Sequence, residues 1–445
     1  MQEEFKALMH NGTYVLVPLP QGRKPISTQW LYKVKLHTNS LIDCYKARWV
    51  AKGFTQRFSI NYNSTFSPVI WIENLWLLLA FVNACNLEIH QVDVDMAFLH
   101  AKLTEEIYIS QPEGFSLYGL KQAPLEWNCT IDAHLCKSHF EPTDLDPCIY
   151  IRQGHHLAIV ALYVNDCTII THKSKLRGVK QIIADSFLIK DLREATSILG
   201  IKIQCDQSLG KLYIQQRGKI NNILTTFGLT NSKPVSTLML PNLQLPVNTK
   251  QHDTFKYHSA IGMLLYLAHA SRPDILFPIA YLSHFANNFS PKHVTTVKCI
   301  MHYLAGTANL AICYSCDLYN DRDVATHVPI RYCDANWGNI EVNRQSVSGV
   351  VFIFCRGAIS WSVKTQKCIA LSSTEAELNA ISEATRQALY VCKHLPALGV
   401  DTQQPLSLFN DNQSALAIID ILSSTYHGHM KHYDIKLTHL RDTTS

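Results

Sequence analysis

The chain has 445 residues, of which 47% are hydrophobic and 17% are charged, a balance typical of packed globular domains and unlike that of disordered chains. Its length accommodates two or three domains of roughly 150 residues each. The long apolar runs, such as Leu75 to Val82, are far shorter than the ~20 residues of a membrane-spanning helix, and we identify no signal peptide. We therefore expect a soluble intracellular protein with no membrane partner, in the cytoplasm or the nucleus.

Net charge and cysteine content narrow the possible partners only slightly. The formal net charge is +5 and the isoelectric point is about 8.4, which permits a nucleic-acid partner but is weaker than a strongly basic signal. Only Cys313 and Cys316 among the 14 cysteines have a two-residue spacing. Scattered free thiols are therefore favoured over a zinc site.

After a short helix and strand expected within Met1 to Pro20, two strands and a longer helix are predicted. Alternating residues predict strands at Trp30 to Leu36 and Tyr45 to Val50, and the basic residues of the second strand are typical of a solvated hairpin. Apolar positions between Ile72 and Cys85 recur at helical spacing. We expect the apolar face of this helix to pack behind the strand that contains Asp93.

Acidic residues interrupt the next two apolar segments. Residues Leu87 to His100 include a strand with Asp93 near its end, and residues Leu157 to Thr171 predict a β-hairpin with Asn165 and Asp166 at its tip. Both tip residues also tolerate turn geometry without any further role, and this alternative stays open. If the segments are adjacent, the carboxylates offer oxygen ligands suited to Mg²⁺.

The middle of the chain predicts shorter elements and a connecting segment. The segment from Thr230 to Thr254 contains three prolines and few periodic positions, so we expect it to be a connection. The elements around it are expected at Lys173 to Phe187 (helix), Ile198 to Ile203 and Leu212 to Gln215 (strands), and Tyr257 to Leu267, Pro273 to Ala286 and His293 to Leu304 (helices).

The last part of the chain predicts strands and helices with acidic residues near their ends. Asp334 and Asp411 follow predicted strands, and Glu377 lies on a long predicted helix. Such an arrangement can assemble carboxylates around two metal ions. Alternatively, both aspartates are turn residues and Glu377 forms a helix-capping box with Thr374. Further strands are expected at Val350 to Phe354, Ala358 to Trp361 and Ile369 to Leu371.

A set of motifs occurs in order along the chain. The motifs span Tyr45 to Phe54, Thr65 to Val69, His90 to Val94, Tyr118 to Pro124, Tyr163 to Asp166, Tyr332 to Trp337, Arg344 to Gly349, Ala370 to Glu377, Asp411 to Ala415 and Lys431 to Ile435. In this combination the chain resembles the reverse transcriptase and ribonuclease H region of copia-type LTR retrotransposon Pol polyproteins, in a degenerate form. The resemblance covers essentially the whole chain and implies a piece of a longer polyprotein.

The resemblance implies a multidomain α+β and α/β fold. Residues 1–229 would form the fingers and palm of a reverse transcriptase, residues 230–326 a largely helical connection, and residues 327–445 a ribonuclease H-like domain. The implied activities are RNA-directed DNA polymerisation and cleavage of the RNA strand of a hybrid. The implied partners are an RNA template, a DNA primer, the RNA/DNA hybrid and deoxynucleoside triphosphates.

The resemblance also assigns site residues. The implied nucleotide-binding residues are Lys46, Arg48, Lys52 and Gln122; the implied ligands of Mg²⁺ or Mn²⁺ are Asp93 and Asp166 in the polymerase and Asp334, Glu377 and Asp411 in the ribonuclease H domain.

Two positions depart from the pattern of the family. Asn165 stands where the family has aspartate, and Asp166 is expected to point to the opposite face, so we expect polymerisation to be lost. The family's fourth ribonuclease H acid lies in a segment that would follow Ser445, and Asp434 is a candidate replacement. A non-catalytic transposon relic, or a protein that only binds nucleic acid, is the alternative.

Overall fold

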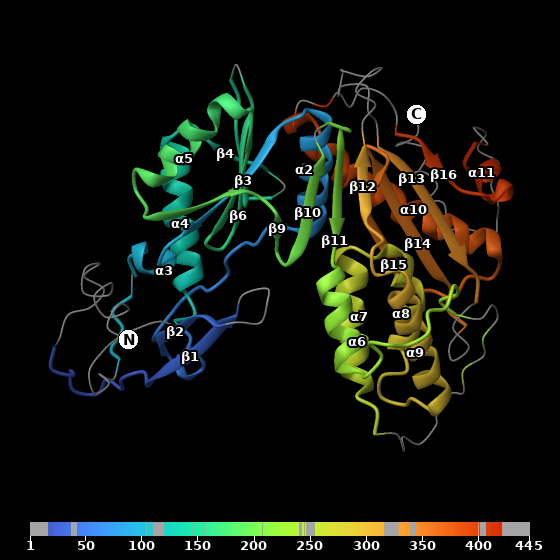
Figure 1. Cartoon of the computed structure of the whole chain (residues 1–445), viewed down its shortest axis with the longest axis horizontal. Helices are drawn as coiled ribbons and strands as arrows, with labels where there is room; N and C mark the ends of the chain where they lie inside the picture. Colours follow the sequence, from blue (N-terminus) through green and yellow to red (C-terminus); the bar gives the residue numbers. More distant parts are fainter. Residues whose placement is uncertain are drawn as a thin grey trace. The chain divides into compact units, whose positions relative to one another are not determined.

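The computed structural model describes residues 17–36, 42–103, 105–109, 120–144, 146–154, 156–206, 208–239, 243, 245, 254–315, 329–338, 344–398, 400 and 406–420. The chain divides into two compact units, one of Met1–Ile70 with Glu88–Glu194 and one of Trp71–Leu87 with Ala195–Ser445. Both units combine helices with sheets (Figure 1), which confirms the expected mixed α/β class. The domain boundaries after residues 229 and 326 stay a prediction.

The first unit is built on a six-stranded antiparallel sheet in the order β4-β5-β6-β7-β3-β8. Nearly every residue of its central strands β6 and β7 is buried, which explains why their sequence is continuously apolar. These two strands confirm the expected hairpin. The strands are β3 (Glu88–Val94), β4 (Glu141–Pro142), β5 (Ile149–Arg152), β6 (Ala158–Tyr163), β7 (Asp166–Thr171) and β8 (Ile189–Glu194).

Among its described residues, three α-helices and a separate hairpin complete the first unit. Helix α5 buries Leu176, Val179 and Ile183, which lie on one helical face and pack toward β3 and β7. In the hairpin, Trp30 pairs with Trp49, and such aromatic cross-strand pairs stabilise a ladder by up to about 1 kcal/mol. The elements are β1 (Thr28–Leu36), β2 (Ile42–Ala51), α3 (Ala97–His100), α4 (Ala123–Lys137) and α5 (Leu176–Ala184).

Helix α2 (Ile72–Ala84) has the expected boundaries but a different packing. Every residue from Asn74 to Asn83 is buried, so the helix is enclosed on all sides and does not present a single apolar face. It belongs to the second unit, and this packing replaces the one that we expected against the Asp93 strand. The strands around it are β11 (Lys211–Gln215), β12 (Ile312–Ser315) and β15 (Gly357–Thr365).

The second unit contains one antiparallel sheet in the order β12-β11-β10-β9 and a group of helices. The single strand expected at Ile198 to Ile203 is two strands, because Leu199 and Gly200, with φ angles of 54° and 77°, turn the chain between them. The three helices expected after the connection are confirmed. The elements are β9 (Ser197–Ile198), β10 (Ile201–Asp206), α6 (Arg217–Thr226), α7 (Tyr257–Ala270), η3 (Pro273–Ile275), α8 (Leu276–Ser283) and α9 (Pro291–Gly306).

The other sheet of the second unit has the order β15-β14-β13-β16, with β13 antiparallel to β14 and parallel to β16. Helix α10 packs against β13 and β14. The strand expected at Ile369 to Leu371 is wrong, since β15 takes the pairing with β14 and these residues form the link to α10, with Ile369 and Leu371 exposed. The elements are β13 (Ile330–Asn336), β14 (Val347–Phe354), α10 (Ser373–His394), β16 (Leu408–Phe409) and α11 (Gln413–Asp420).

Glu383 joins α10 to β15 through a pH-sensitive ion pair. Burial raises the pKa of Glu383, but hydrogen bonds from Lys364, Arg386 and Gln387 outweigh burial and lower the pKa from 4.5 to about 2. A carboxylate that is more acidic in the folded chain contributes stability above its unfolded pKa, and this contribution is lost as the pH falls through the folded pKa.

We expect Glu383→Gln to destabilise the chain at pH 7 and to flatten the pH dependence of its stability between about pH 4.5 and pH 2. Urea unfolding at a series of pH values measures this, and Asp420→Asn, at an exposed position of α11, serves as the control. An unchanged pH dependence in Glu383→Gln would show that the ion pair contributes no net stability.

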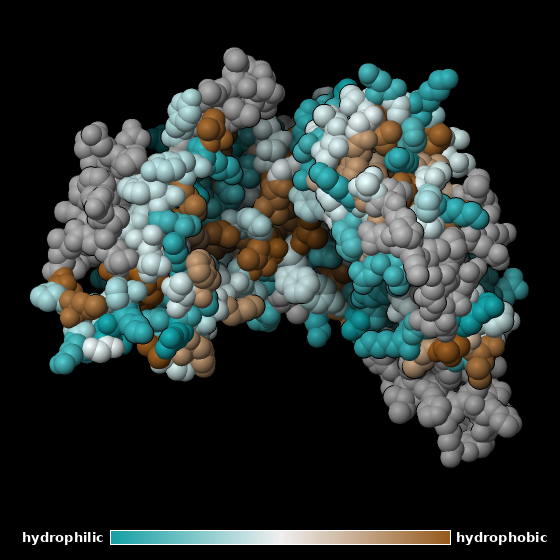
Figure 2. All heavy atoms as spheres, turned by 90° about the horizontal axis from the view of Figure 1, so that it is seen from below, coloured by the Kyte–Doolittle hydropathy of each residue, from teal (hydrophilic) through white to brown (hydrophobic). Residues whose placement is uncertain are grey.

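Figure 2 shows hydrophilic and hydrophobic residues interspersed over one face of the molecule. Within the part of the chain that the structure describes, no helix combines the length and the apolar character needed to cross a membrane.

Candidate active sites

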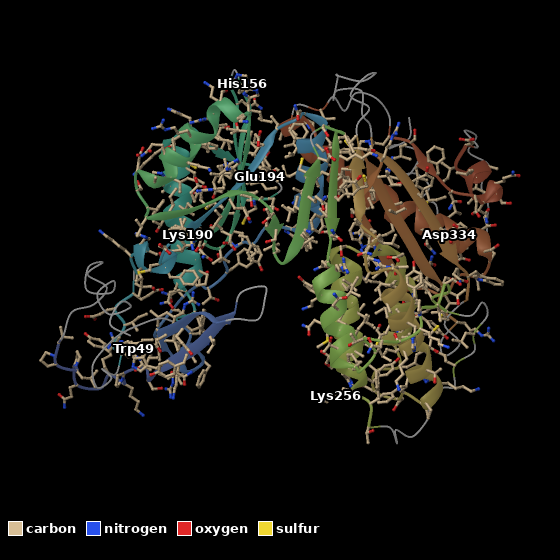
Figure 3. The ribbon with its side chains drawn as sticks, in the orientation of Figure 1. Trp49, His156, Lys190, Glu194, Lys256 and Asp334 are labelled. Atoms are coloured by element: carbon tan, nitrogen blue, oxygen red, sulfur yellow. The ribbon has the colours of Figure 1, made fainter. Side chains whose placement is uncertain are left out.

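Three carboxylates meet beside the parallel strands of the second unit. Asp334 lies near the end of β13, Glu377 in the first turns of α10, and Asp411 two residues after β16. One oxygen of each lies within 4.8 Å of the others, and Figure 3 labels Asp334 at this place. Among the described residues, no other group of three or more metal-ligating side chains is assembled in this way. The cluster offers the oxygen ligands that hard divalent ions prefer.

The start of α10 explains why Glu377 joins the cluster and Glu375 does not. Ser372 caps the helix, with its hydroxyl accepting from the Glu375 N–H at 3.1 Å, while Glu375 Oε2 accepts from the Leu371 N–H at 2.7 Å. The side chain of Glu375 therefore stabilises the N-terminus of α10. The capping box that sequence allows between Thr374 and Glu377 is not formed, which leaves Glu377 for the cluster.

Asn410 is a member of the site that no sequence pattern identifies. Its Nδ2 donates to Glu377 Oε2 at 2.8 Å. Burial raises the pKa of Glu377, the hydrogen bond from Asn410 lowers it, and the negative charges of Asp334 and Asp411 raise it again, with a net increase. Asn410 therefore orients the buried carboxylate and favours its charged form. Asp434, the candidate fourth acid, lies outside the described residues.

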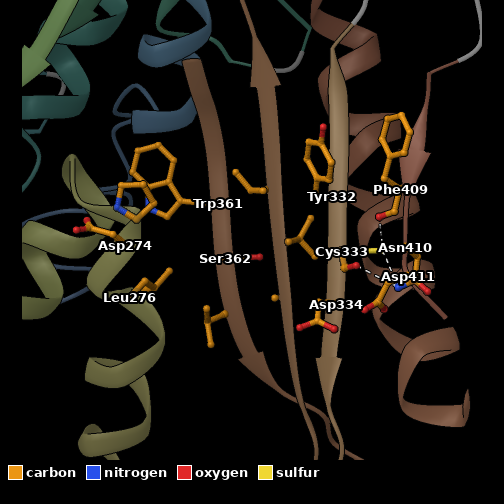
Figure 4. A pocket seen from close by; sticks show the side chains of 15 residues that line it. Asp274, Leu276, Tyr332, Cys333, Asp334, Trp361, Ser362, Phe409, Asn410 and Asp411 are labelled. Carbon is orange, nitrogen blue, oxygen red and sulfur yellow. Dashed lines mark hydrogen bonds between the residues drawn. The ribbon is translucent and has the colours of Figure 1, made fainter. Parts of the chain in front are cut away.

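A groove of about 680 Å³ leads away from this cluster across the sheet (Figure 4). Its lining includes Asp334 and Asp411 of the cluster and also Asp274 of η3, which is not part of the cluster. Trp361 of β15 also lines the groove, and its indole Nε1 donates to Ala268 O at 2.9 Å, which fixes the ring. A molecule held at the carboxylates can therefore extend over a mostly apolar surface.

In the first unit, Asp93 and the β6–β7 tip are brought together as the sequence predicts. Asp93 and Asp166 are directly opposite each other on β3 and β7. The tip between the strands is a two-residue turn of Val164 and Asn165. Asn165 Nδ2 donates to Asp93 Oδ1, and the Val94 N–H donates to Asn165 O at 3.0 Å. The amide thus occupies one oxygen of the neighbouring carboxylate.

The expected orientation of Asp166 is corrected by the strand register. Because Asp166 is paired directly with Asp93, both side chains lie on the same face of the sheet. Burial and the negative charge of Asp93 raise the pKa of Asp166. Alternation of faces does not extend into the turn, where Val164 has a φ of 59°. Trp127, which sequence reasoning missed, supports this turn by donating its Nε1 to Val164 O at 2.6 Å.

The predicted nucleotide-binding residues have different environments. Arg48 is exposed on β2, and Lys52 follows the end of that strand, whereas the side chain of Lys46 lies outside the described ones. Gln122 is fully buried. Its oxygen accepts from Gln56 Nε2, and its nitrogen donates to a backbone carbonyl, both at 3.0 Å. Gln122 is therefore a hydrogen-bonded core residue here, and its contact with nucleotide stays a prediction.

Comparison with protein families identifies the chain. Residues 11–241 match the family model described as reverse transcriptase (RNA-dependent DNA polymerase). The chain belongs to the reverse transcriptase family. The matched region includes both β3 and the β6–β7 tip, so Asp93, Asn165 and Asp166 lie within the part of the chain that matches this family.

Similarity to transposon proteins extends over nearly the whole chain. The chain is 36% identical, over 99% of its own length, to the retrovirus-related Pol polyprotein from transposon TNT 1-94 of Nicotiana tabacum. It is 32% identical, again over 99%, to the corresponding polyprotein from transposon RE1 of Arabidopsis thaliana. The chain spans 34% and 31% of these two relatives, about a third of their length. The predicted resemblance to copia-type Pol polyproteins is confirmed.

Among solved structures, a foamy viral protease-reverse transcriptase in complex with double-stranded DNA aligns with 80% of this chain and 57% of that chain, at 13% identity and a TM-score of 0.18. A score this low does not establish a shared overall arrangement.

Proposed function

We propose that this reverse transcriptase relative has a working ribonuclease H centre and an inactive polymerase centre. The observation that carries the first part is the approach of Asp334, Glu377 and Asp411, with one oxygen of each within 4.8 Å of the others. In this proposal, residues 327–445 are the ribonuclease H-like domain, residues 1–229 the fingers and palm, and residues 230–326 the connection. The substrate is the RNA strand of an RNA/DNA hybrid.

Mg²⁺ or Mn²⁺ fits the three carboxylates because hard divalent ions prefer oxygen donors. When bound, such ions activate water and neutralise charge on the phosphoryl group that is attacked. The protein residues contribute differently. Glu377 is buried and oriented by Asn410, so it is a fixed ligand, whereas Asp334 and Asp411 are exposed and line the groove.

The loss of polymerase activity follows from the chemistry of Asn165. An amide oxygen is a neutral ligand, so a metal ion here would have one negative charge fewer than in the family's site. The amide nitrogen also donates to Asp93, and this hydrogen bond competes with a cation for the electron density of that oxygen. The template, the primer and deoxynucleoside triphosphates are therefore proposed as partners for binding only.

Incubation of the purified full chain with a hybrid whose RNA strand is end-labelled tests the ribonuclease H proposal. We expect the RNA strand to be shortened when Mg²⁺ or Mn²⁺ is present and to stay intact with a chelator. The DNA strand and single-stranded RNA are matched substrates that should remain uncut. A folded chain that binds the hybrid but never cuts it would support the non-catalytic alternative.

We expect the chain to bind nucleic acid even where catalytic activity is lost, because contacts with phosphates need only basic and polar groups. We expect the affinity for hybrid to fall about 10-fold between 50 and 200 mM salt for every two phosphates contacted. Titrations at several salt concentrations measure this slope. Tight binding that does not respond to salt would rule out a phosphate-dominated interface.

A further inference from the structure

The two strands that carry the exposed aspartates share one sequence pattern. Tyr332 precedes Asp334 by two residues on β13, and Phe409 precedes Asp411 by two residues at β16. The strands are parallel, with Tyr332 opposite Phe409. Residues two apart on a strand share a face at a separation of about 7 Å, as Tyr332 and Asp334 do on β13. Asp411 lies beyond the end of β16, and it lines the same groove as Phe409. The aromatic pair of Tyr332 and Phe409 therefore lies beside the two aspartates (Figure 4).

This aromatic pair is ordered and open to solvent. The ring centroids of Tyr332 and Phe409 are 5.2 Å apart, and the ring planes differ by 22°. The residues are nevertheless 46% and 49% exposed. Trp361, in the same groove, is only 6% exposed and is fixed by its hydrogen bond to Ala268 O. The groove thus has a rigid base and, beside the carboxylates, a stacked aromatic surface that can accept another ring.

We propose that the Tyr332 and Phe409 pair is a stacking platform for an unpaired nucleobase of the strand whose backbone lies at the carboxylate cluster. The proposal deepens the proposed ribonuclease H function and rests on it. The groove is continuous with the carboxylate cluster, because Asp334 and Asp411 belong to the cluster and also line the groove. A strand held there therefore has its neighbouring nucleotides over the platform.

The occupant is a base and not a phosphate, because the rings are apolar and the charged residues that line the groove are all aspartates. Every nucleobase has a π-face, and stacking on an aromatic side chain is tolerant of sequence. Bases inside a duplex already stack on their neighbours, so an unpaired base has the more accessible face. The platform therefore selects hybrids that have an unpaired nucleotide next to the duplex.

Two otherwise identical hybrids test this selection. One carries a single unpaired adenine at the duplex end, and the other carries an abasic nucleotide there, so both have the same phosphates; the extension is placed on each strand end in turn. With Ca²⁺ in place of Mg²⁺, and hybrid integrity checked after each titration, we expect the adenine to tighten binding about 5- to 150-fold. A 2-aminopurine at the same position should lose fluorescence on binding.

The matched variants differ at one position. Phe409→Leu keeps an apolar side chain but removes the ring, and should abolish both the preference and the fluorescence change. Phe409→Tyr keeps the ring and should retain both. Thermal unfolding of each variant establishes that it is folded. Tyr332→Leu provides the same comparison on β13.

Equal affinity for the adenine and abasic hybrids would overturn the platform, as would a preference that survives in Phe409→Leu. Self-association of the wild-type chain that is lost in Phe409→Leu would assign the groove to a second copy and also overturn it. Cleavage is scored separately on a fully paired hybrid with Mg²⁺. A base preference without any cleavage would refute the ribonuclease H function alone, and cleavage without a base preference would refute the platform alone.

Discussion

Glu377→Gln is expected to reduce cleavage of hybrid RNA by at least about 100-fold, because it removes a carboxylate that we propose binds metal directly. Changes to residues that only support metal ligands typically cost 10- to 100-fold, so a ligand should cost at least as much. The amide is nearly isosteric, and Asn410 can still contact its oxygen, so folding should be preserved. Initial cleavage rates at saturating Mg²⁺ measure the effect.

Glu375→Gln is the matched control on the same helix. Its side-chain oxygen can still accept from the Leu371 N–H, and it takes no part in the carboxylate cluster, so cleavage should stay within about 3-fold of wild type. Asp411→Asn should resemble Glu377→Gln. If Asp411→Asn leaves the rate unchanged, the assignment of this cluster as the catalytic centre is wrong.

Asn165→Asp is expected to increase primer extension on an RNA template from little or none by at least about 10-fold. The change adds a carboxylate beside Asp93 and Asp166, which restores the negative charge that two divalent ions require. Single-turnover extension with Mg²⁺, compared between the chain and Asn165→Asp, measures the gain. Robust extension without the substitution would contradict an inactive polymerase centre.

Two controls separate the site from general charge effects. Asn221→Asp makes the same chemical change at an exposed position of α6 and should leave extension unchanged. Asp93→Asn, added to Asn165→Asp, should abolish any restored activity. If Asn165→Asp binds hybrid normally and still extends no primer, Asn165 is not the sole defect.

Local patterns predict much of this fold because they depend on neighbouring residues. The β6–β7 hairpin and helix α2 appear where continuous apolar runs and helical spacing place them. The partner of α2 was not predictable, since apolar spacing identifies a buried helix but not the strands that bury it. The β9–β10 break was also missed, because Leu199 adopts a positive φ that side-chain pattern does not reveal.

In the candidate sites, too, the sequence predicts some residues, whereas others depend on contacts between distant parts of the chain. The resemblance predicts that Asp334, Glu377 and Asp411 lie close together, and in the structure they do. Asn410 could not be found, because its role depends on a hydrogen bond across to α10. The orientation of Asp166 was misjudged because alternation was extended through a turn, whereas the register of β3 and β7 decides which side chains face each other.

The hydrogen bond from Asn165 to Asp93 gives the proposed loss of polymerase activity a thermodynamic rationale. A third carboxylate beside Asp93 and Asp166 would add repulsion that only bound cations relieve. The amide replaces this repulsion with a hydrogen bond to a charged group, which contributes about 1.5–3 kcal/mol. Natural chains stay just above a stability threshold, so selection for folding alone would retain asparagine once copying RNA no longer mattered. The first unit would then fold independently of the cellular magnesium supply.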